Sequence, residues 1–293
     1  MIKKREFLPG FMKALTGWIA PGKRYDFLVS AAYGMLSCSG IRKKVAFQNM
    51  DIAFPDKQKA WKKDVLKRHY KHLAISLGEY FLLLQNPENI AQYMRPEKDP
   101  LFLDELRDNK KGAVILTAHM GNWEMLAAWL AHRGYPMHAI VRRHEEEETE
   151  AFVEQARNRV GLRTISKSEN MIKVLRMLRK GAFVGILGDQ YAGPEGIPLR
   201  FFGRETSCYF GAAALALMAK VPLVPVISWR ETPFSHLVRI CPPLFPFPGD
   251  EEGEKTFSRE KRIEDLTEKG NRLLENWIRE HPEQWLWLHR RYR

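Results

Sequence analysis

Residues 113–130 read AVILTAHMGNWEMLAAWL and decide which kind of fold the chain forms. A short apolar run at residues 113–116 comes first, a polar stretch follows, and a helix-compatible run rich in Ala, Leu, Met and Trp ends the segment. This pattern predicts a buried strand, a tight turn and then a helix. In α/β folds the carboxyl end of such a strand meets the helix N-terminus at an open crevice, where ligands bind.

His119 and Glu124 are the titratable residues of this turn. On one continuous helix, residues five apart would point about 140° away from each other. The two side chains therefore converge only if His119 precedes the helix and Glu124 lies in its first turn, with Asn122 as the N-cap. We expect Glu124 within hydrogen-bond reach of His119, so that the pair forms a general base and its orienter for a nucleophile that the substrate supplies. The alternative is that each side chain is solvated separately in a surface loop.

The composition narrows the class of protein. The chain has 293 residues, of which 45% are hydrophobic, enough for one large α/β domain or two smaller ones. Its net charge of +12, from 47 Lys and Arg against 35 Asp and Glu, favours an anionic partner such as nucleic acid, an anionic membrane or an acidic carrier protein. The 3 cysteines are widely spaced and indicate a reducing compartment. Because HExxH and CxxC motifs are absent, we expect no metal.

The first 44 residues combine apolar stretches with basic clusters. Residues 7–20 and 27–40 are apolar but are interrupted by Lys, Gly or Pro, and neither is an uninterrupted run of the roughly 18 to 20 apolar residues of a spanning helix. They also lack the clean apolar core and cleavage site of a signal peptide. We interpret them as helices that lie in a membrane interface, with Trp18 and the Phe residues facing lipid. Ordinary amphipathic helices docked on the domain are the alternative.

From residue 113 onward, strand and helix patterns alternate, which predicts an α/β fold with a mostly parallel mixed sheet flanked by helices. The expected strands are 113–116, 137–141, 163–165, 183–187, 223–228, 237–240 and a last one at 285–289. The expected helices are 57–85, 100–109, 123–133, 145–159, 168–179 with Ser168 as N-cap, 208–219 and 259–281. We divide the chain into an N-terminal helical membrane-associating region, 1–99, and a catalytic α/β domain, 100–293.

Asp189 follows the apolar run AFVGIL and Gly188, so the pattern places it at the carboxyl end of a strand. In a parallel sheet this is the same rim as that of His119. The alternative is a structural Asp that caps the turn. Arg157 belongs to the RNRVG segment and has the fork geometry that binds phosphate or carboxylate, although any such Arg alone is more often a solvated surface charge. The glycines after Asp189 match no Walker or dinucleotide fingerprint, so nucleotide binding is set aside.

Two further patterns have structural interpretations as well as functional ones. His69 and His72 are three apart on a helix rich in Lys and Arg, which indicates a solvated or packing face rather than a ligand pair. The C-terminal HPEQWLWLHRRYR combines aromatic and basic residues. This composition is compatible with a last strand and a basic tail, and also with binding of nucleic acid or of lipid headgroups.

Several motifs then point to one family. TAHMGNWEML, GILGDQ, FFGRET and HPEQWLWLHRR occur in this order, and NMDIAFPD precedes the long helix. HMGNWE resembles the His-x4-Asp/Glu motif of glycerolipid acyltransferases. The whole set resembles one branch of them, the bacterial lipid A biosynthesis (lauroyl/myristoyl) acyltransferases, over most of the chain. The resemblance implies a glycerolipid-acyltransferase-like fold and transfer of a fatty acyl chain from an acyl-carrier-protein or CoA thioester to a hydroxyl of a lipid A precursor.

The resemblance also implies a role for each site residue. His119 is the general base that deprotonates the acceptor hydroxyl, and Glu124 orients it and stabilises its imidazolium. Asn122 and backbone donors of the turn face the thioester or its oxyanion. Arg157 lies near acidic groups of the acceptor, and Asp189 is a second polar residue of the site. The acceptor hydroxyl attacks directly, so no covalent acyl-enzyme and no cofactor beyond the acyl thioester co-substrate are expected.

The implied partners are an acyl carrier protein, a membrane glycolipid acceptor and an anionic membrane surface, and no nucleic acid. The implied location is the cytoplasmic face of the bacterial inner membrane. Many relatives have a clearer single membrane span, whereas Pro21, Lys23 and Arg24 interrupt the apolar stretches here, so we expect peripheral or monotopic attachment. Three alternatives stay open: another acceptor (an ornithine lipid, a lysophospholipid or another glycolipid), thioester hydrolysis, and a non-catalytic basic protein that binds membrane surfaces or nucleic acid.

Overall fold

The computed structural model describes residues 22–141, 154, 157–166, 169–245 and 257–293. Three features expected from the sequence lie wholly or mostly outside these ranges. They are the apolar stretch at residues 7–20, most of the helix at 145–159, and the N-cap at Ser168.

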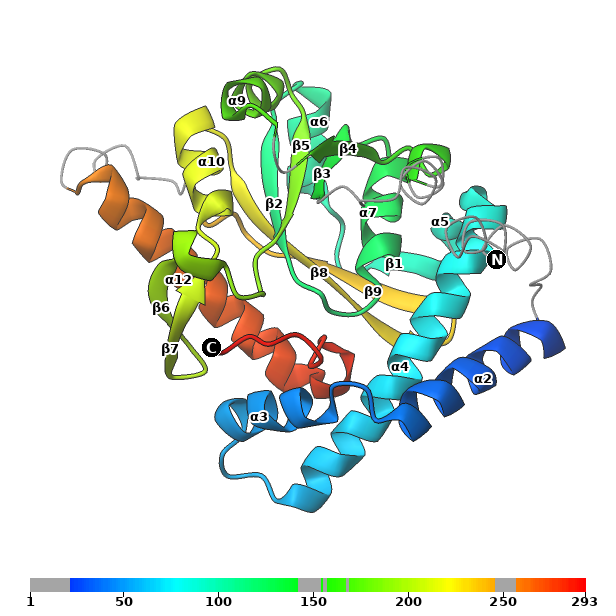
Figure 1. Cartoon of the computed structure of the whole chain (residues 1–293). Coiled ribbons are helices and arrows are strands. Elements are labelled where there is room, and N and C mark those ends of the chain that lie inside the picture. The colour runs from blue at the N-terminus through cyan, green and yellow to red at the C-terminus, as the bar shows by residue number, and fades with distance from the viewer. Residues whose placement is uncertain (1–21, 142–153, 155–156, 167–168, 246–256) are drawn as a thin grey trace, which may run out of the picture.

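A seven-stranded mixed sheet in the order β1-β9-β8-β2-β5-β3-β4 forms the centre of the molecule (Figure 1). Its strands are β1 (Met94–Pro96), β2 (Ala113–Thr117), β3 (Met137–Val141), β4 (Arg163–Ser166), β5 (Phe183–Leu187), β8 (Leu223–Thr232) and β9 (Ser235–Ile240). The pairs β2–β5, β2–β8, β3–β4, β3–β5 and β1–β9 are parallel, and β8 and β9 are antiparallel. The predicted α/β fold with a mostly parallel mixed sheet is therefore confirmed.

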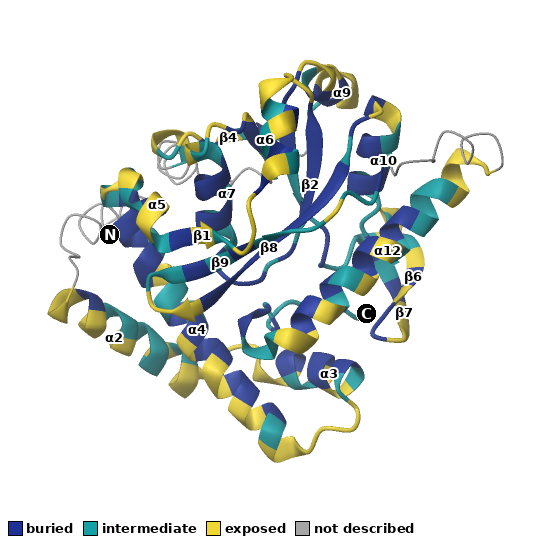
Figure 2. Ribbon diagram, turned by 180° about the vertical axis from the view of Figure 1, so that it is seen from behind, coloured by how far each residue is buried: buried dark blue, intermediate teal, exposed yellow. Residues whose placement is uncertain are grey.

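Helices cover both faces of the sheet because successive side chains of its central strands point to opposite faces. In β2, Ala113 and Ile115 pack in one core with α6 (Leu101–Asp108), α7 (Trp123–His132) and α5 (Ile90–Tyr93). Val114 and Leu116 pack in a second core with α9 (Met171–Arg179), α10 (Gly211–Ala219) and α12 (Arg259–Glu280). Figure 2 shows β2 and β8 in dark blue, buried between these layers. A strand buried on both faces explains the continuous apolar run at residues 113–116.

The N-terminal helices share a core with the C-terminal segment. Side chains of α3 (Lys43–Ala53) and α4 (Lys59–Gln85) pack in one cluster with Trp277, Trp285 and Trp287, and α2 (Lys23–Ser39) packs along α4. The short helix η1 (Pro87–Asn89) follows α4. Strand β1, at residues 94–96, pairs with β9. The division at residue 99 therefore does not separate two independent cores.

The C-terminal segment is not the strand expected at residues 285–289. It contains a short helix, η3 (Pro282–Gln284), and then an irregular stretch whose single described β-bridge joins Trp285 to Met120. Trp285 and Trp287 are buried as their alternation suggested, but their neighbour in space is the turn after β2 rather than a sheet edge. Here the alternation of side chains reflects local packing, not strand pairing.

A second sheet, the hairpin of β6 (Ile197–Phe201) and β7 (Arg204–Cys208), was not expected. Phe202 and Gly203 at its tip both have positive φ, the conformation of a two-residue hairpin turn, and Phe is an unusual residue there.

The helices near this hairpin begin at slightly different residues from those expected. Because Cys208 ends β7, α10 begins at Gly211 rather than at residue 208. The 3-10 helix η2 (Gly193–Glu195) precedes the hairpin. Helix α9 begins at Met171, and Asn170 caps it by accepting from the N–H of Ile172.

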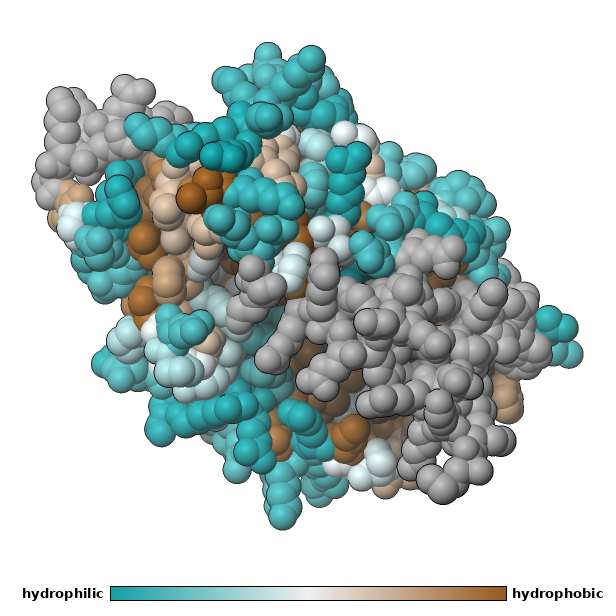
Figure 3. Space-filling model, turned by 45° about the horizontal axis from the view of Figure 1, so that its top comes forward, coloured by the Kyte–Doolittle hydropathy of each residue, from teal (hydrophilic) through white to brown (hydrophobic). Residues whose placement is uncertain are grey.

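In the described part of the chain, no helix is both long and apolar enough to cross a membrane. Large apolar side chains do reach the surface, and Figure 3 shows brown patches between hydrophilic residues on one face. The exposed large apolar residues include Phe27, Met35, Leu101, Met171 and Ile172.

Candidate active site

The turn between β2 and α7 has the geometry that its spacing predicted. Strand β2 ends at Thr117 and α7 begins at Trp123, so His119 lies before the helix and Glu124 in its first turn. The Oδ1 atom of Asn122 accepts from the N–H of Met125 at 3.4 Å, which makes Asn122 the N-cap. We call residues 118–122 the catalytic turn from here on.

Asp189 is the carboxylate that binds His119. The Nδ1 atom of His119 lies 2.9 Å from Oδ1 of Asp189, and the backbone N–H of His119 donates to Oδ2 at 3.1 Å. Asp189 is only 1% exposed, and Oδ2 also accepts from the indole Nε1 of Trp285 at 2.8 Å. The two residues meet because β2 and β5 are parallel neighbours, with Thr117 opposite Leu187. The prediction that His119 and Asp189 lie at the same edge of the sheet is confirmed.

This contact fixes the tautomer of His119. An ionised carboxylate only accepts hydrogen bonds, so Nδ1 carries the proton and Nε2 carries the lone pair. Burial alone would lower the pKa of His119, but the charge and hydrogen bond of Asp189, helped by the charge of Glu124, raise it above 6.5. Burial would likewise raise the pKa of Asp189, but its contacts with His119 and Trp285 hold it below its ordinary value. The imidazole is thus a base of increased proton affinity.

The expected hydrogen bond between Glu124 and His119 is absent from the described contacts. The Oε1 atom of Glu124 instead accepts from Nη2 of Arg157 at 3.3 Å, and both side chains are partly buried. The reason is geometric: the catalytic turn aims the imidazole toward the end of β5, while the first turn of α7 directs Glu124 into the cavity described below. Glu124 acts on His119 through its charge, and Asp189 supplies the hydrogen bond.

Asn122 does not face a substrate as expected. Its side chain is 4% exposed, and its Nδ2 atom donates to the backbone oxygen of Ser76 and to Oε2 of Glu79, both at 3.2 Å. Three backbone N–H groups of the turn are also occupied within the protein: His119 donates to Asp189, Met120 to Ala118, and Gly121 to Gln284. These donors hold the turn in place and are not directed at an oxyanion.

A largely apolar cavity of about 80 Å³ lies beside the turn, between α7 and the strands β2, β3 and β5. Its lining includes the apolar residues Ala127, Leu130, Ile140, Gly185 and Leu187. Thr117, Glu124 and Arg157 are the polar residues of the lining. Trp123 also lines the cavity and packs edge-on against the imidazole of His119, with ring centroids 5.2 Å apart. His119 and the cavity are therefore adjacent, with the indole of Trp123 between them.

Gln190 and Trp285 contact the His119–Asp189 pair and were not singled out by the sequence patterns. The Nε2 atom of Gln190 lies 3.3 Å from Nε2 of His119, so its amide donates to the lone pair that a substrate hydroxyl would need. The sequence indicated these two residues only by their position: Gln190 follows Asp189, and Trp285 lies in the aromatic C-terminal motif.

No group of three or more His, Cys, Asp or Glu side chains within the described residues is arranged to hold a metal ion.

Comparison with known proteins agrees with this geometry. The family model for bacterial lipid A biosynthesis acyltransferases matches residues 15–293. The chain is 23% identical over 258 residues to the lipid A biosynthesis palmitoleoyltransferase of Escherichia coli K12, covering 86% of this chain and 79% of the relative. It is 21% identical over 261 residues to the lipid A biosynthesis lauroyltransferase of the same organism, with the same shares covered.

A second group of relatives is named for a different lipid. The phosphatidylinositol mannoside acyltransferase of Mycolicibacterium smegmatis is 24% identical over 147 residues, which cover 49% of this chain and 48% of that protein. Since the family model spans nearly the whole chain, and these relatives are named as acyltransferases, the match defines both family and type of reaction. The chain is an acyltransferase and belongs to the bacterial lipid A biosynthesis acyltransferase family.

Proposed function

We propose that this acyltransferase moves a fatty acyl chain from an acyl-carrier-protein or CoA thioester to a hydroxyl of a lipid A precursor. One observation carries the proposal: a histidine whose Nδ1 is bound by a buried Asp189 is adjacent to a cavity lined by apolar side chains. Such a histidine is suited to take a proton, and such a cavity is suited to a hydrocarbon chain.

The proposed reaction needs no nucleophile from the protein. Nε2 of His119 removes the proton of the acceptor hydroxyl, whose oxygen attacks the thioester carbonyl carbon. The tetrahedral intermediate then collapses, the C–S bond breaks, and the imidazolium returns the proton to the departing thiolate. The ester product and the free thiol leave, and His119 is neutral again. For the hydroxyl to reach Nε2, it must replace the hydrogen bond from Gln190. We propose no metal or other cofactor.

The cavity is the proposed site of the acyl chain. Burying a methylene group contributes about 0.8 kcal/mol, so a cavity with few polar lining atoms favours a hydrocarbon chain. Glu124 and Arg157 lie at its polar part, where their ion pair keeps the guanidinium in place. We propose that Arg157 faces the acidic groups of the acceptor, and that Glu124 holds Arg157 and adds negative charge near His119.

Helix α2 is the proposed contact with the membrane. Phe27 and Met35 are 66% and 72% exposed and, with exposed Ala31 between them, recur every fourth residue along one face of the helix. Lys23 precedes this face and Lys43 follows it, and both are exposed. An apolar stripe flanked by cations suits a surface of anionic lipids. We propose peripheral attachment to the cytoplasmic face of the inner membrane, where the net charge of +12 also attracts an acidic carrier protein.

A second candidate acceptor is a different membrane glycolipid. The similarity to enzymes named as phosphatidylinositol mannoside acyltransferases supports this alternative, because the shared segment covers about half of each chain. In that case the base, the cavity and the thioester donor keep the same roles, and only the acceptor differs.

The test is a transfer assay with purified protein, in which acyl-carrier-protein and acyl-CoA donors meet a panel of lipid acceptors and products are identified by mass spectrometry. We expect acyl transfer to a lipid A precursor, and about a 10²–10⁴-fold loss of that activity in His119→Ala, the range that a general base contributes. The control is the melting temperature, which should remain that of a folded protein because Asp189 keeps the hydrogen bonds from Trp285 and from the backbone N–H at position 119. Wild-type turnover by His119→Ala would rule out this mechanism, and product without acceptor would indicate hydrolysis.

A further inference from the structure

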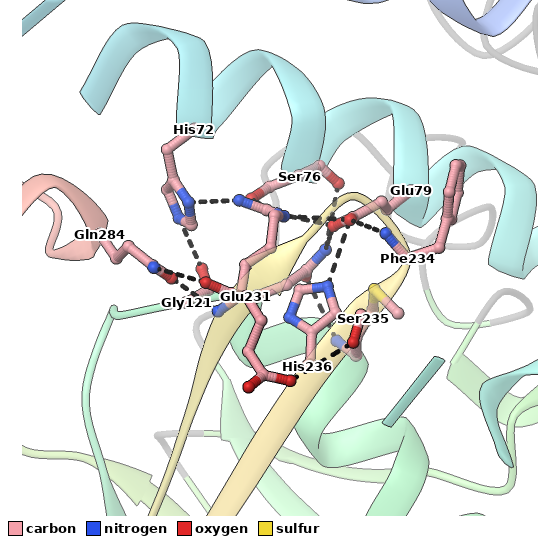
Figure 4. Close-up of polar contacts among 12 residues, drawn as sticks. His72, Ser76, Glu79, Gly121, Glu231, Phe234, Ser235, His236 and Gln284 are labelled. Carbon is pink, nitrogen blue, oxygen red and sulfur yellow. Dashed lines mark hydrogen bonds and ion pairs between the residues drawn. The ribbon is translucent and has the colours of Figure 1, made fainter. Parts of the chain in front are cut away.

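A second group of titratable residues lies buried behind the catalytic turn, between α4 and the β8–β9 hairpin (Figure 4). Its centre is Glu79 of α4, whose side chain is 0% exposed. Oε1 accepts from Nε of Arg230 at 3.0 Å, from Nε2 of His236 at 3.2 Å and from the backbone N–H of Phe234 at 3.0 Å. Oε2 accepts from Nη2 of Arg230 at 2.6 Å. We call Glu79, Arg230, His236 and His72 the buried cluster.

The hydrogen bonds of His72 define its protonation state. Nη1 of Arg230 contacts Nδ1 of His72, and Nε2 of His72 lies 3.0 Å from the backbone oxygen of Gly121. A guanidinium can only donate, so Nδ1 of His72 must accept, and the single ring proton lies on Nε2 and is donated to Gly121. Burial and the charge of Arg230 keep the pKa of His72 well below its ordinary value, in agreement with a neutral ring.

The buried cluster meets the catalytic turn at two consecutive residues. His72 donates to the carbonyl of Gly121, and Oε2 of Glu79 accepts from Nδ2 of Asn122 at 3.2 Å. Gly121 has φ of 59°, and a Cβ atom added there would lie 2.1 Å from the backbone oxygen of Ser228 on β8. The turn is therefore pressed against β8 and held from the side of α4, two residues after His119.

The same turn is held on its other side by the C-terminal segment. The N–H of Gly121 donates to the backbone oxygen of Gln284, and the N–H of Leu286 donates to the oxygen of His119. Gln284 also exchanges two hydrogen bonds with the backbone of Arg230. The backbone of the turn is thus fixed through Arg230 and its neighbours, and none of the four residues of the buried cluster lines the cavity.

From these contacts we infer that His72 and Glu79 are positioning residues for the general base. They fix the carbonyl of Gly121 and the side chain of Asn122, and so hold the imidazole of His119 on Asp189 and beside the cavity. This inference rests on the proposed role of His119. A displacement of about 1 Å in a reacting group can cost about 10²-fold in rate, so loss of the Gly121 contact should appear in turnover.

A matched pair of substitutions tests the inference. A Gln at position 72 can donate to Gly121 through its amide nitrogen and accept from Arg230 through its oxygen, whereas Asn is one methylene shorter and cannot span both groups. We expect kcat of His72→Gln within about threefold of wild type, and a fall of about 10–10²-fold for His72→Asn, with KM for the donor little changed. Similar kcat values in the two variants would overturn the inference.

A second readout does not depend on any substrate. Because neutral His72 carries no charge, its replacement removes no charge near His119, and a change in the pKa of His119 reports its geometry. In protein labelled with ¹³C at histidine Cε1, with the His119 signal assigned by His119→Gln, we expect the raised pKa of His119 to fall toward 6.5 in His72→Asn and to persist in His72→Gln. An unchanged pKa in both would contradict the inference, whether or not the proposed lipid acceptor is correct.

His69 is the control for general damage to α4. It is 0% exposed on the same helix, and its Nδ1 lies 3.1 Å from the backbone oxygen of Glu283 rather than from the catalytic turn. We expect His69→Asn to lower the melting temperature about as much as His72→Asn but to leave kcat within about threefold of wild type. If His69→Asn lowers kcat as strongly, the effect of His72 is ordinary loss of stability and the inference fails.

Discussion

The described residues include two centres in which a buried carboxylate binds histidine, and the centres differ in what else the carboxylate contacts. Asp189 accepts hydrogen bonds from the neutral Trp285 and from His119, whose charge changes when it takes up a proton. Glu79 binds Arg230 through two hydrogen bonds, together with His236, Phe234 and Asn122. The side chain of His119 is 18% exposed, whereas those of Glu79 and His236 are 0% exposed.

The two kinds of contact suit two different roles, one in holding the fold and one in proton transfer. A carboxylate paired with a permanently charged guanidinium has one stable charge state, and changing it leaves a buried charge without a partner. A carboxylate paired with an imidazole can lower the cost of an added proton on that imidazole without being fixed in one state. The first arrangement suits a rigid framework, and the second suits a base that gains and loses a proton in each cycle.

Loss of the Glu79 charge should give the largest effect, on folding. In Glu79→Gln the guanidinium of Arg230 stays buried without a counter-charge, and breaking such a pair costs about 3–5 kcal/mol. We expect a corresponding fall in the free energy of unfolding, measured by urea denaturation. The control is Glu268→Gln, which removes the partner of Arg272 in a pair whose side chains are 42% and 71% exposed, and should cost less than about 1 kcal/mol. Equal costs for the two variants would remove the distinction between a structural and a surface pair.

Loss of the Asp189 charge should act on turnover more than on folding. Asn at this position can leave the proton of His119 on the wrong nitrogen, and we expect kcat to fall about 10²–10³-fold. The measurement is the transfer assay under saturating donor, with circular dichroism as the check that the variant is folded. An Asp189→Asn enzyme with normal kcat would mean that Asp189 caps the turn and does not assist the base.

Loss of the Glu124 charge should give the smallest of the three effects. Glu124 contacts Arg157 and reaches His119 only through its charge, so we expect Glu124→Gln to lower kcat/KM about 10-fold, less than Asp189→Asn does. Arg157→Gln should give a loss of similar size, because each residue holds the other. If Glu124→Gln is instead the more damaging variant, the carboxylate of the His-x4-Glu motif has a larger part in catalysis than its contacts indicate.

The sequence predicted the elements around His119 well because their signals are local. A continuous apolar run marked β2, and the five-residue gap placed His119 before α7 and Glu124 in its first turn, as observed. Asp189 was placed on the same rim because strand ends of a parallel sheet share an edge. The direction of a side chain is not a local property, and so the partner of His119 was predicted as Glu124 rather than Asp189.

The missed features are those that depend on contacts distant in sequence. His69 and His72 were interpreted as a solvated or packing face rather than a ligand pair, and their burial agrees with packing, but the sequence did not indicate that His72 contacts Arg230 of the β8–β9 hairpin. Arg230 and His236, which bind Glu79, lie more than a hundred residues away from it on that hairpin. Trp285 reaches Asp189 because the C-terminal segment passes beside the catalytic turn, which no periodicity in HPEQWLWLHRR could indicate.

The most direct test of the account is the pH dependence of kcat/KM in wild type and Asp189→Asn. The base acts only when His119 is neutral, so activity falls as the pH drops through the pKa of His119. Asp189 raises that pKa above 6.5, and without its charge burial would lower it. We predict a wild-type inflection above pH 6.5 that moves to a lower pH in Asp189→Asn. An inflection at the same pH in both enzymes would show that Asp189 does not set the basicity of His119 and would contradict the account.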